Sequence, residues 1–204
     1  MDILSKLFGS AGRIKIMRLF LFNPDIVFEN KDIHARSKVS PEQVRREVAL
    51  LRSIGFIKKK AFVKLRPATS GKKALKKHIS GWVLNESFRL LIPLQNLLIH
   101  VDPLKKEEIT HRFAHCGRLK LVVLSGVFIQ EMDSRVDMLI VGDSLRKRVI
   151  EHVMRIIEAE IGKELSYAIL DTKEFLYRFG IYDKFVRDIF DYPHEKIVDK
   201  LGVF

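Results

Sequence analysis

The sequence predicts an α+β protein with two domains, and its charge distribution is the first reason. The 204 residues carry a net charge of +12, but residues 1–100 hold 20 Lys and Arg against 7 Asp and Glu, whereas residues 101–204 hold 17 against 18. A uniformly solvated surface would not divide in this way. The second reason is the order of patterns: helical periodicity and one basic β-prone stretch come first, and strands mixed with helices follow. We therefore expect two domains with different tasks, of which the first has a polyanionic partner.

Three helices with short connections are predicted in the N-terminal half. The first spans Gly9–Phe22 and the second Asn30–Ala35. The third begins at Ser40-Pro41-Glu42-Gln43, where Ser is a favoured N-cap, Pro a favoured first helical residue and Glu an acid in the first turn. Gly55 ends it, and its core-facing positions are Val44, Val48 and Leu51. This order matches a helix-turn-helix whose third helix is the recognition helix.

A basic hairpin follows the third helix. Phe56–Val63 is β-prone, and Ile79–Leu84 is the predicted returning strand. Between Ile57 and Lys77 the chain has nine basic residues and no acid: Lys58, Lys59, Lys60, Lys64, Arg66, Lys72, Lys73, Lys76 and Lys77. A basic hairpin directly after a recognition helix is typical of the wing of a winged helix, so residues 1–84 are predicted to be a winged-helix domain that binds double-stranded DNA.

The predicted contacts with DNA divide into base-reading and phosphate-binding residues. Burial of Val44 and Val48 is expected to aim Gln43 and Arg46 outward, with Arg45 beside them. Gln pairs well with adenine and Arg with guanine in the major groove. Lys38 and the nine basic residues of the hairpin are expected to contact phosphates, which adds affinity without sequence information. The alternative is the solvated face of an ordinary helical domain.

Residues 85–104 are expected to connect the two domains. Asn85–His100 has the apolar pattern of a helix, with a kink expected at Pro93. A helix this apolar beside a small domain is expected to pack against the other domain or a second subunit, which leaves a homodimer open.

Residues 105–204 are predicted to form a small α/β domain with a mixed sheet covered mainly on one side by helices. The expected strands are Leu119–Leu124, Val136–Val141 and Leu165–Leu170. The expected helices are Lys105–His115, Leu145–Ile161, Thr172–Phe179 and Asp183–Phe190.

Two short motifs stand out in this half: Ser125-Gly126 ends one expected strand, and Asp133-Ser134-Arg135-Val136-Asp137 leads into the next. These motifs resemble those of the minimal nucleotidyltransferases of the DNA polymerase β superfamily. The whole chain resembles prokaryotic proteins that join a winged helix to such a domain. The resemblance implies a Gly-Ser turn that holds a triphosphate, an Asp-x-Asp pair and a third carboxylate. Carboxylate oxygens of this kind hold two divalent metals in that family.

The chain departs from the family pattern at three of these points. Arg135 occupies the first Asp position and leaves Asp137 alone, Val127 replaces the phosphate-binding hydroxyl, and the third strand has no carboxylate. A guanidinium repels a metal and is able to pair with Asp137 itself. We therefore expect a degenerate site, comprising Ser125, Gly126, Arg135 and Asp137, without metal, cofactor or nucleotidyl transfer. Asp133 is the one residue that offers a replacement ligand.

The leading hypothesis from sequence is a cytoplasmic DNA-binding transcriptional regulator. Its C-terminal domain would serve sensing of a nucleotide, dimerisation or binding of a protein. The alternatives are an active metal-dependent nucleotidyltransferase targeted by its winged helix, and a winged-helix adaptor that binds proteins. No apolar stretch approaches the roughly 18 residues of a membrane span. The single Cys116 fits a reducing compartment, and with His111 and His115 it is expected to be structural.

Overall fold

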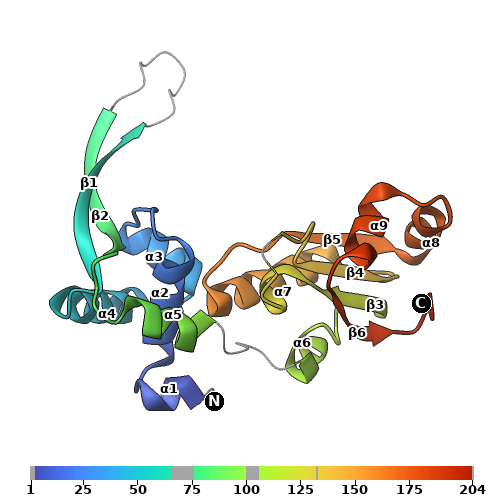
Figure 1. Cartoon of the computed structure of the whole chain (residues 1–204), viewed down its shortest axis with the longest axis horizontal. Coiled ribbons are helices and arrows are strands. Elements are labelled where there is room, and N and C mark those ends of the chain that lie inside the picture. The colour runs from blue at the N-terminus through green and yellow to red at the C-terminus, as the bar shows by residue number, and fades with distance from the viewer. Residues whose placement is uncertain (1–2, 66–75, 100–105, 132, 204) are drawn as a thin grey trace. The chain divides into compact units, whose positions relative to one another are not determined.

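The structure is a computed structural model that describes residues 3–65, 76–99, 106–131 and 133–203 (Figure 1). The chain divides into two compact units. Residues 1–101 and 158–163 form the N-terminal unit, and residues 102–157 and 164–204 form the C-terminal unit. The N-terminal unit is helical with one antiparallel hairpin, and the C-terminal unit contains a four-stranded mixed sheet with helices. The predicted α+β class is therefore confirmed.

The N-terminal unit begins with four helices and then forms the hairpin. The helices are α1 (Ile3–Leu7), α2 (Ala11–Phe22), α3 (Asn30–Ser37) and α4 (Pro41–Ser53). The strands β1 (Ile57–Leu65) and β2 (Lys76–Leu84) pair from Ile57 opposite Leu84 to Leu65 opposite Lys76, and α5 (Leu91–Ile99) follows. The three predicted helices and both strands are confirmed, with longer strands than expected. Helix α1 was not predicted.

The core of this unit forms around α2, whose side chains are buried on most sides. Ile16 and Phe20 have no exposed surface, and Phe20 meets Phe28 edge to face at 5.6 Å. Val44, Val48 and Leu51 of α4 are buried in the same cluster, as their spacing predicted. Phe28 also bridges to Trp82 through two backbone hydrogen bonds of 2.9 Å, so the segment before α3 lies along the edge of β2.

The prediction of one helix over Asn85–His100 is wrong in its first part. Residues 85–90 form turns, and α5 begins only at Leu91, while His100 lies outside the described residues. Pro93 is therefore the third residue of α5. A residue in the first turn needs no N–H for an intrahelical bond, so the expected kink has no basis.

The sheet of the C-terminal unit has the strand order β5-β4-β3-β6. Its strands are β3 (Arg118–Leu124), β4 (Met138–Asp143), β5 (Tyr167–Asp171) and β6 (Glu195–Asp199). β4 and β5 are parallel, whereas β3 is antiparallel to both β4 and β6, which confirms a mixed sheet. The helices are α6 (Lys106–Arg112), α7 (Lys147–Ile161), α8 (Thr172–Gly180) and α9 (Lys184–Asp191), and a 3-10 turn, η1, spans Gly126–Phe128. Strand β6 was not predicted.

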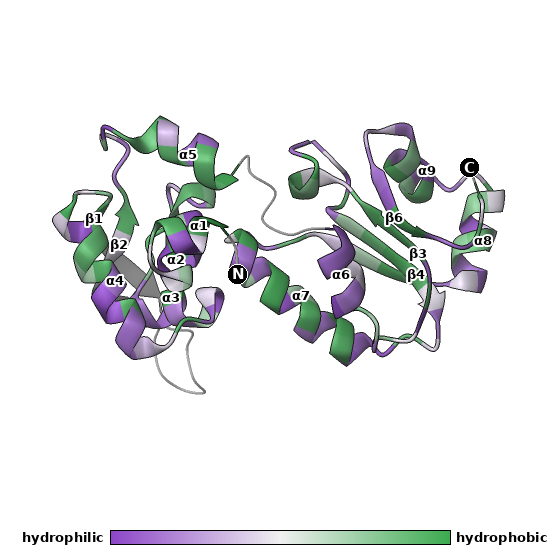
Figure 2. Ribbon diagram, turned by 90° about the horizontal axis from the view of Figure 1, so that it is seen from below, coloured by the Kyte–Doolittle hydropathy of each residue, from purple (hydrophilic) through white to green (hydrophobic). Residues whose placement is uncertain are grey.

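Both faces of the central strands are buried, which corrects the expectation of a sheet covered mainly on one side. Residues 121–124 of β3 and 138–141 of β4 are at most 2% exposed, and successive side chains of a strand point to opposite faces. One face packs with Phe175, Val186 and Ile189 of α8 and α9. Figure 2 shows β3 and β4 as largely hydrophobic, whereas hydrophilic and hydrophobic residues alternate along α7.

The last turn of α7 belongs to the N-terminal unit. The Arg18 guanidinium donates to the carbonyls of Leu98 (2.8 Å) and Glu160 (3.2 Å), and the Asn23 amide donates to that of Gly162 (3.0 Å). Arg18 is only 3% exposed, so this arginine satisfies backbone carbonyls inside the fold.

Over the described residues, no helix combines the length and apolarity needed to cross a membrane.

Candidate functional site

The outward face of α4 presents arginines directly after a short turn. Arg45 and Arg46 are exposed, while the preceding residue, Val44, is fully buried in the core. The turn from α3 consists of Lys38, Val39 and Ser40. Lys38 is exposed and adopts the left-handed conformation (φ 56°), and its N–H donates to the His34 carbonyl at 3.0 Å. The Ser40 hydroxyl caps α4 by accepting from the Gln43 N–H at 3.3 Å.

The side chain of Gln43 does not point outward, which corrects its predicted orientation. Its amide donates to the Ser10 hydroxyl at 3.2 Å, and a Cβ on Gly12 would lie 2.5 Å from the same amide nitrogen. The Ser10 hydroxyl donates to Glu47 at 2.7 Å, and Arg13 Nε donates to the other Glu47 oxygen at 2.8 Å. This polar cluster holds the start of α2 against α4.

The acids of α4 are both neutralised by arginines. Glu42 pairs with Arg46 at 2.7 Å on the surface, and the nearly buried Glu47 pairs with Arg13. Among the described residues, Arg45 makes no ion pair. The start of α4 also borders a polar hollow of about 320 Å³, lined by Gly9, Ser10, Arg13, Ser40, Gln43, Arg46 and Glu47.

Three lysines in the first half of the basic hairpin are exposed. Lys58, Lys59 and Lys60 on β1 all face solvent and make no ion pair with any described residue. Lys64, Lys76 and Lys77 lie on β1 and β2, with Lys64 opposite Lys77. The expectations for Arg66, Lys72 and Lys73 fall outside the described residues.

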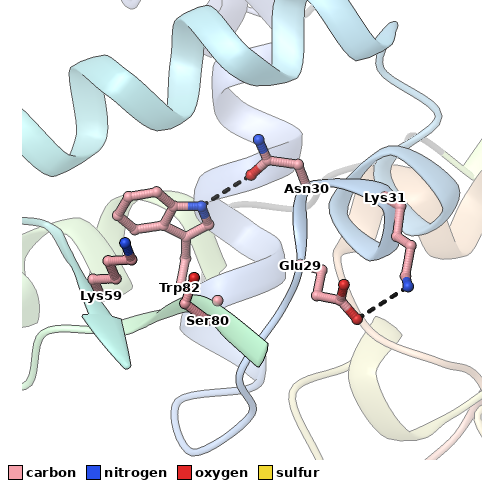
Figure 3. A pocket seen from close by; sticks show the side chains of 7 residues that line it. Glu29, Asn30, Lys31, Lys59, Ser80 and Trp82 are labelled. Carbon is pink, nitrogen blue, oxygen red and sulfur yellow. Dashed lines mark hydrogen bonds and ion pairs between the residues drawn. The ribbon is translucent and has the colours of Figure 1, made fainter. Parts of the chain in front are cut away.

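A second hollow, of about 360 Å³, lies where β1 and β2 meet the start of α3 (Figure 3). The Trp82 indole N–H donates to Asn30 at 2.9 Å, and the Arg52 guanidinium lies 5.8 Å from the indole centre. Lys59 is directly opposite Trp82 on the neighbouring strand, and Lys31 pairs with Glu29 at 3.1 Å. Sequence reasoning treated Trp82 only as a strand residue. The sequence did offer a signal for this residue, because Trp82 is the single Trp of the chain and follows a basic run.

In the C-terminal unit, Ser125, Gly126 and Asp137 come together. Asp137 is 7% exposed, and its two carboxylate oxygens accept from the backbone N–H groups of Val127 (2.9 Å) and Ser166 (2.8 Å). Gly126 has φ 58°, and a Cβ there would overlap the Asp137 carboxylate. The Ser125 hydroxyl donates to the Val136 carbonyl. Asp137 thus ties the turn after β3 to the segment before β5.

Arg135 does not join this cluster. Its guanidinium is half exposed and lies 3.6 Å from Asp188 on α9, so the possible pair with Asp137 does not form. Within the described residues, no three His, Cys, Asp or Glu side chains are grouped to hold a metal. Cys116 is fully buried, and burial raises the pKa of its thiol, although nearby Arg146 acts in the opposite direction.

Comparison with protein-family models, curated proteins and solved structures gives no match.

Proposed function

We propose that this protein is a DNA-binding transcriptional regulator whose N-terminal unit is a winged helix. α2, α3 and α4 would form the helix-turn-helix, and β1 and β2 would form the wing. The observation that supports this most is electrostatic: both acids of α4 are neutralised, while Arg45 and Lys58 to Lys60 are exposed and unpaired among the described residues. Ion pairing within the described fold therefore does not account for these cations.

In the proposed complex, the N-terminal turn of α4 enters the major groove. Arg45 and Arg46 are the base-reading residues, and each bidentate contact contributes about 1–3 kcal/mol of discrimination between bases. Arg46 exchanges its surface pair with Glu42 for DNA, and Gln43 joins only by giving up its bond to Ser10. Lys38 and the lysines of β1 bind phosphates.

The C-terminal unit is proposed to work without nucleotidyl transfer. Both oxygens of Asp137 accept backbone hydrogen bonds, and Arg135, at the first position of the Asp-x-Asp motif, pairs with Asp188 instead of Asp137. Sensing of a nucleotide, dimerisation or protein binding on this scaffold remain the proposed tasks.

Fluorescence anisotropy with labelled genomic duplex fragments tests the DNA proposal. Replacing Lys58, Lys59 and Lys60 by Gln is expected to weaken binding to every fragment and to reduce the salt slope by about 0.9 per lost phosphate contact. Arg45→Ala is expected to weaken binding to the preferred fragment more than to the others.

Lys6→Gln is the control for the loss of a single charge, because Lys6 is an exposed lysine of α1 in the same unit. Binding that survives Arg45→Ala and the triple lysine change, or that equals the control at every salt concentration, contradicts the proposal. Binding of a protein through the same face would instead favour the adaptor.

A further inference from the structure

The C-terminal unit has a basic surface of its own, despite its balanced total charge. No Asp or Glu occurs between Glu108 and Glu131, nor between Asp143 and Glu151. These two stretches contain Arg118, Arg146, Lys147 and Arg148, which we call the basic cluster. All four residues are exposed.

Backbone contacts bring the two stretches together. The N–H of Arg146 donates to the Cys116 carbonyl at 2.8 Å, and its guanidinium donates to the His115 carbonyl. Gly117 has φ 131°, and a Cβ there would lie 2.7 Å from the Ser144 carbonyl oxygen. Arg118 lies opposite Asp143 in the backbone register of β3 and β4. The start of β3 therefore lies against the start of α7, and the four cations share one region of the surface.

The stability of the fold explains Arg146, which donates to the His115 carbonyl, but not the other three cations of the cluster. Lys147 and Arg148 are the first two residues of α7, and Arg146 directly precedes them, but the first turn has no acid. The N-terminal end of a helix carries partial positive charge, so each cation there costs about 0.3–1 kcal/mol. No described acid forms an ion pair with the cluster. The two acids nearest in sequence to α7's start, Asp143 and Glu151, carry half as many charges as the four cations.

We propose that the basic cluster binds the phosphate backbone of double-stranded DNA, as a contact surface separate from α4 and the hairpin. Three of its four residues are arginines, whose planar fork matches phosphate oxygens. None of the exposed large hydrophobic residues lies in residues 115–118 or 144–148, so the cluster lacks side chains that insert into lipid. The choice of DNA as the polyanion rests on the function proposed for the N-terminal unit.

The test compares two triple variants of the full chain that remove equal charge from the C-terminal unit. The cluster variant is Arg118→Gln, Lys147→Gln and Arg148→Gln, and it keeps Arg146 because of its contacts with residues 115 and 116. The control is Lys173→Gln, Lys184→Gln and Lys200→Gln, three exposed lysines outside the cluster. Affinity for a duplex of about 25 base pairs is measured from about 50 to 300 mM salt.

The cluster variant is expected to lower the slope of log affinity against log salt by about 2 to 3, at roughly 0.9 per contact, and the control to leave it unchanged. Equal slopes for the two variants, with native circular dichroism, overturn the inference, and so does a wild type that binds no duplex. If the cluster variant loses binding to vesicles of about 30% phosphatidylserine while its DNA binding stays intact, the inference is overturned in favour of a lipid partner.

The Lys58, Lys59 and Lys60 variant separates this inference from the proposed function. If only the cluster variant loses DNA affinity, the function proposed for the N-terminal unit fails and the inference stands. If only the lysine variant of β1 loses affinity, the inference fails and the proposed function stands.

Discussion

Replacement of Asp137 by Asn tests whether this residue is a structural brace. The Asp137 carboxylate is nearly buried, and one oxygen accepts from the Val127 N–H while the other accepts from the Ser166 N–H. Asn has the same shape but only one oxygen. Whichever way its amide is turned, an NH₂ group faces one of these two backbone donors.

The expected cost follows from those two bonds. A hydrogen bond to a charged group contributes about 1.5–3 kcal/mol, and a partly buried N–H that faces an NH₂ group instead of an acceptor adds to the cost. The remaining bond also weakens because the acceptor is neutral. We expect Asp137→Asn to lower the free energy of unfolding of the C-terminal unit by about 2–4 kcal/mol.

Urea unfolding followed by far-ultraviolet circular dichroism measures this change. Fluorescence of Trp82 reports on the N-terminal unit and serves as an internal reference. Asp133→Asn is the matched control, because Asp133 is exposed, lies near in sequence and has the same charge. Its effect is expected to stay within about 0.5 kcal/mol.

A free energy of unfolding that is almost unchanged in Asp137→Asn would refute the structural role of this carboxylate. A metal ligand predicts a different pattern: Mg²⁺ would stabilise the wild type, and both aspartate variants would lose that stabilisation. Transfer of a labelled nucleotide in the presence of Mg²⁺, abolished by Asp137→Asn, would contradict the proposal that the unit is not an enzyme.

Three further predictions concern single residues. Lys38→Gly is expected to raise the free energy of unfolding by about 1 kcal/mol in urea titrations, because glycine tolerates φ 56° without a Cβ penalty. The same change is expected to weaken DNA binding, because it removes one phosphate contact. Hydrogen bonds from the Gly202 and Leu201 backbone and from Lys196 lower the pKa of Asp199, so wild type is expected to be more stable than Asp199→Asn at neutral pH. That difference should shrink in urea titrations as pH falls below about 4, the usual aspartate value, and a constant difference would contradict it. Because burial raises the pKa of Cys116, its thiol is expected to react with a disulfide reagent far faster in denaturant than in the native state at pH 8.

Local signals predicted the elements that depend on local chemistry. Ser40 and Pro41 located the start of α4, because an N-cap hydroxyl and a fixed proline φ act within one turn. Strand β6 was missed because Glu195–Asp199 is short and polar, and its ladder is with β3, more than 70 residues earlier in the chain. Pro93 was misjudged because its effect depends on where α5 begins, which the apolar pattern alone did not define.

The candidate site shows the same limit at the level of side chains. Helical geometry placed Gln43 on the outer side of α4, but Ser10 and the space left by Gly12, both in α2 or its cap, hold its amide. The motif allowed Arg135 to pair with Asp137, but Asp188 of α9 is its partner. In both residues a contact from a distant segment decides the orientation, and no pattern within one helix or strand contains that information.

These contacts also change how the basic excess of residues 1–100 is interpreted. Arg18 satisfies backbone carbonyls inside the fold, and Arg13 neutralises a nearly buried acid, so part of the excess serves structure. Lys58 is exposed and unpaired among the described residues, and it is this kind of cation that releases counterions when it meets phosphate. The same criterion identifies Arg118 in a unit whose total charge gave no sign of a polyanion. Net charge therefore counts cations with two different tasks, and only burial and pairing separate them.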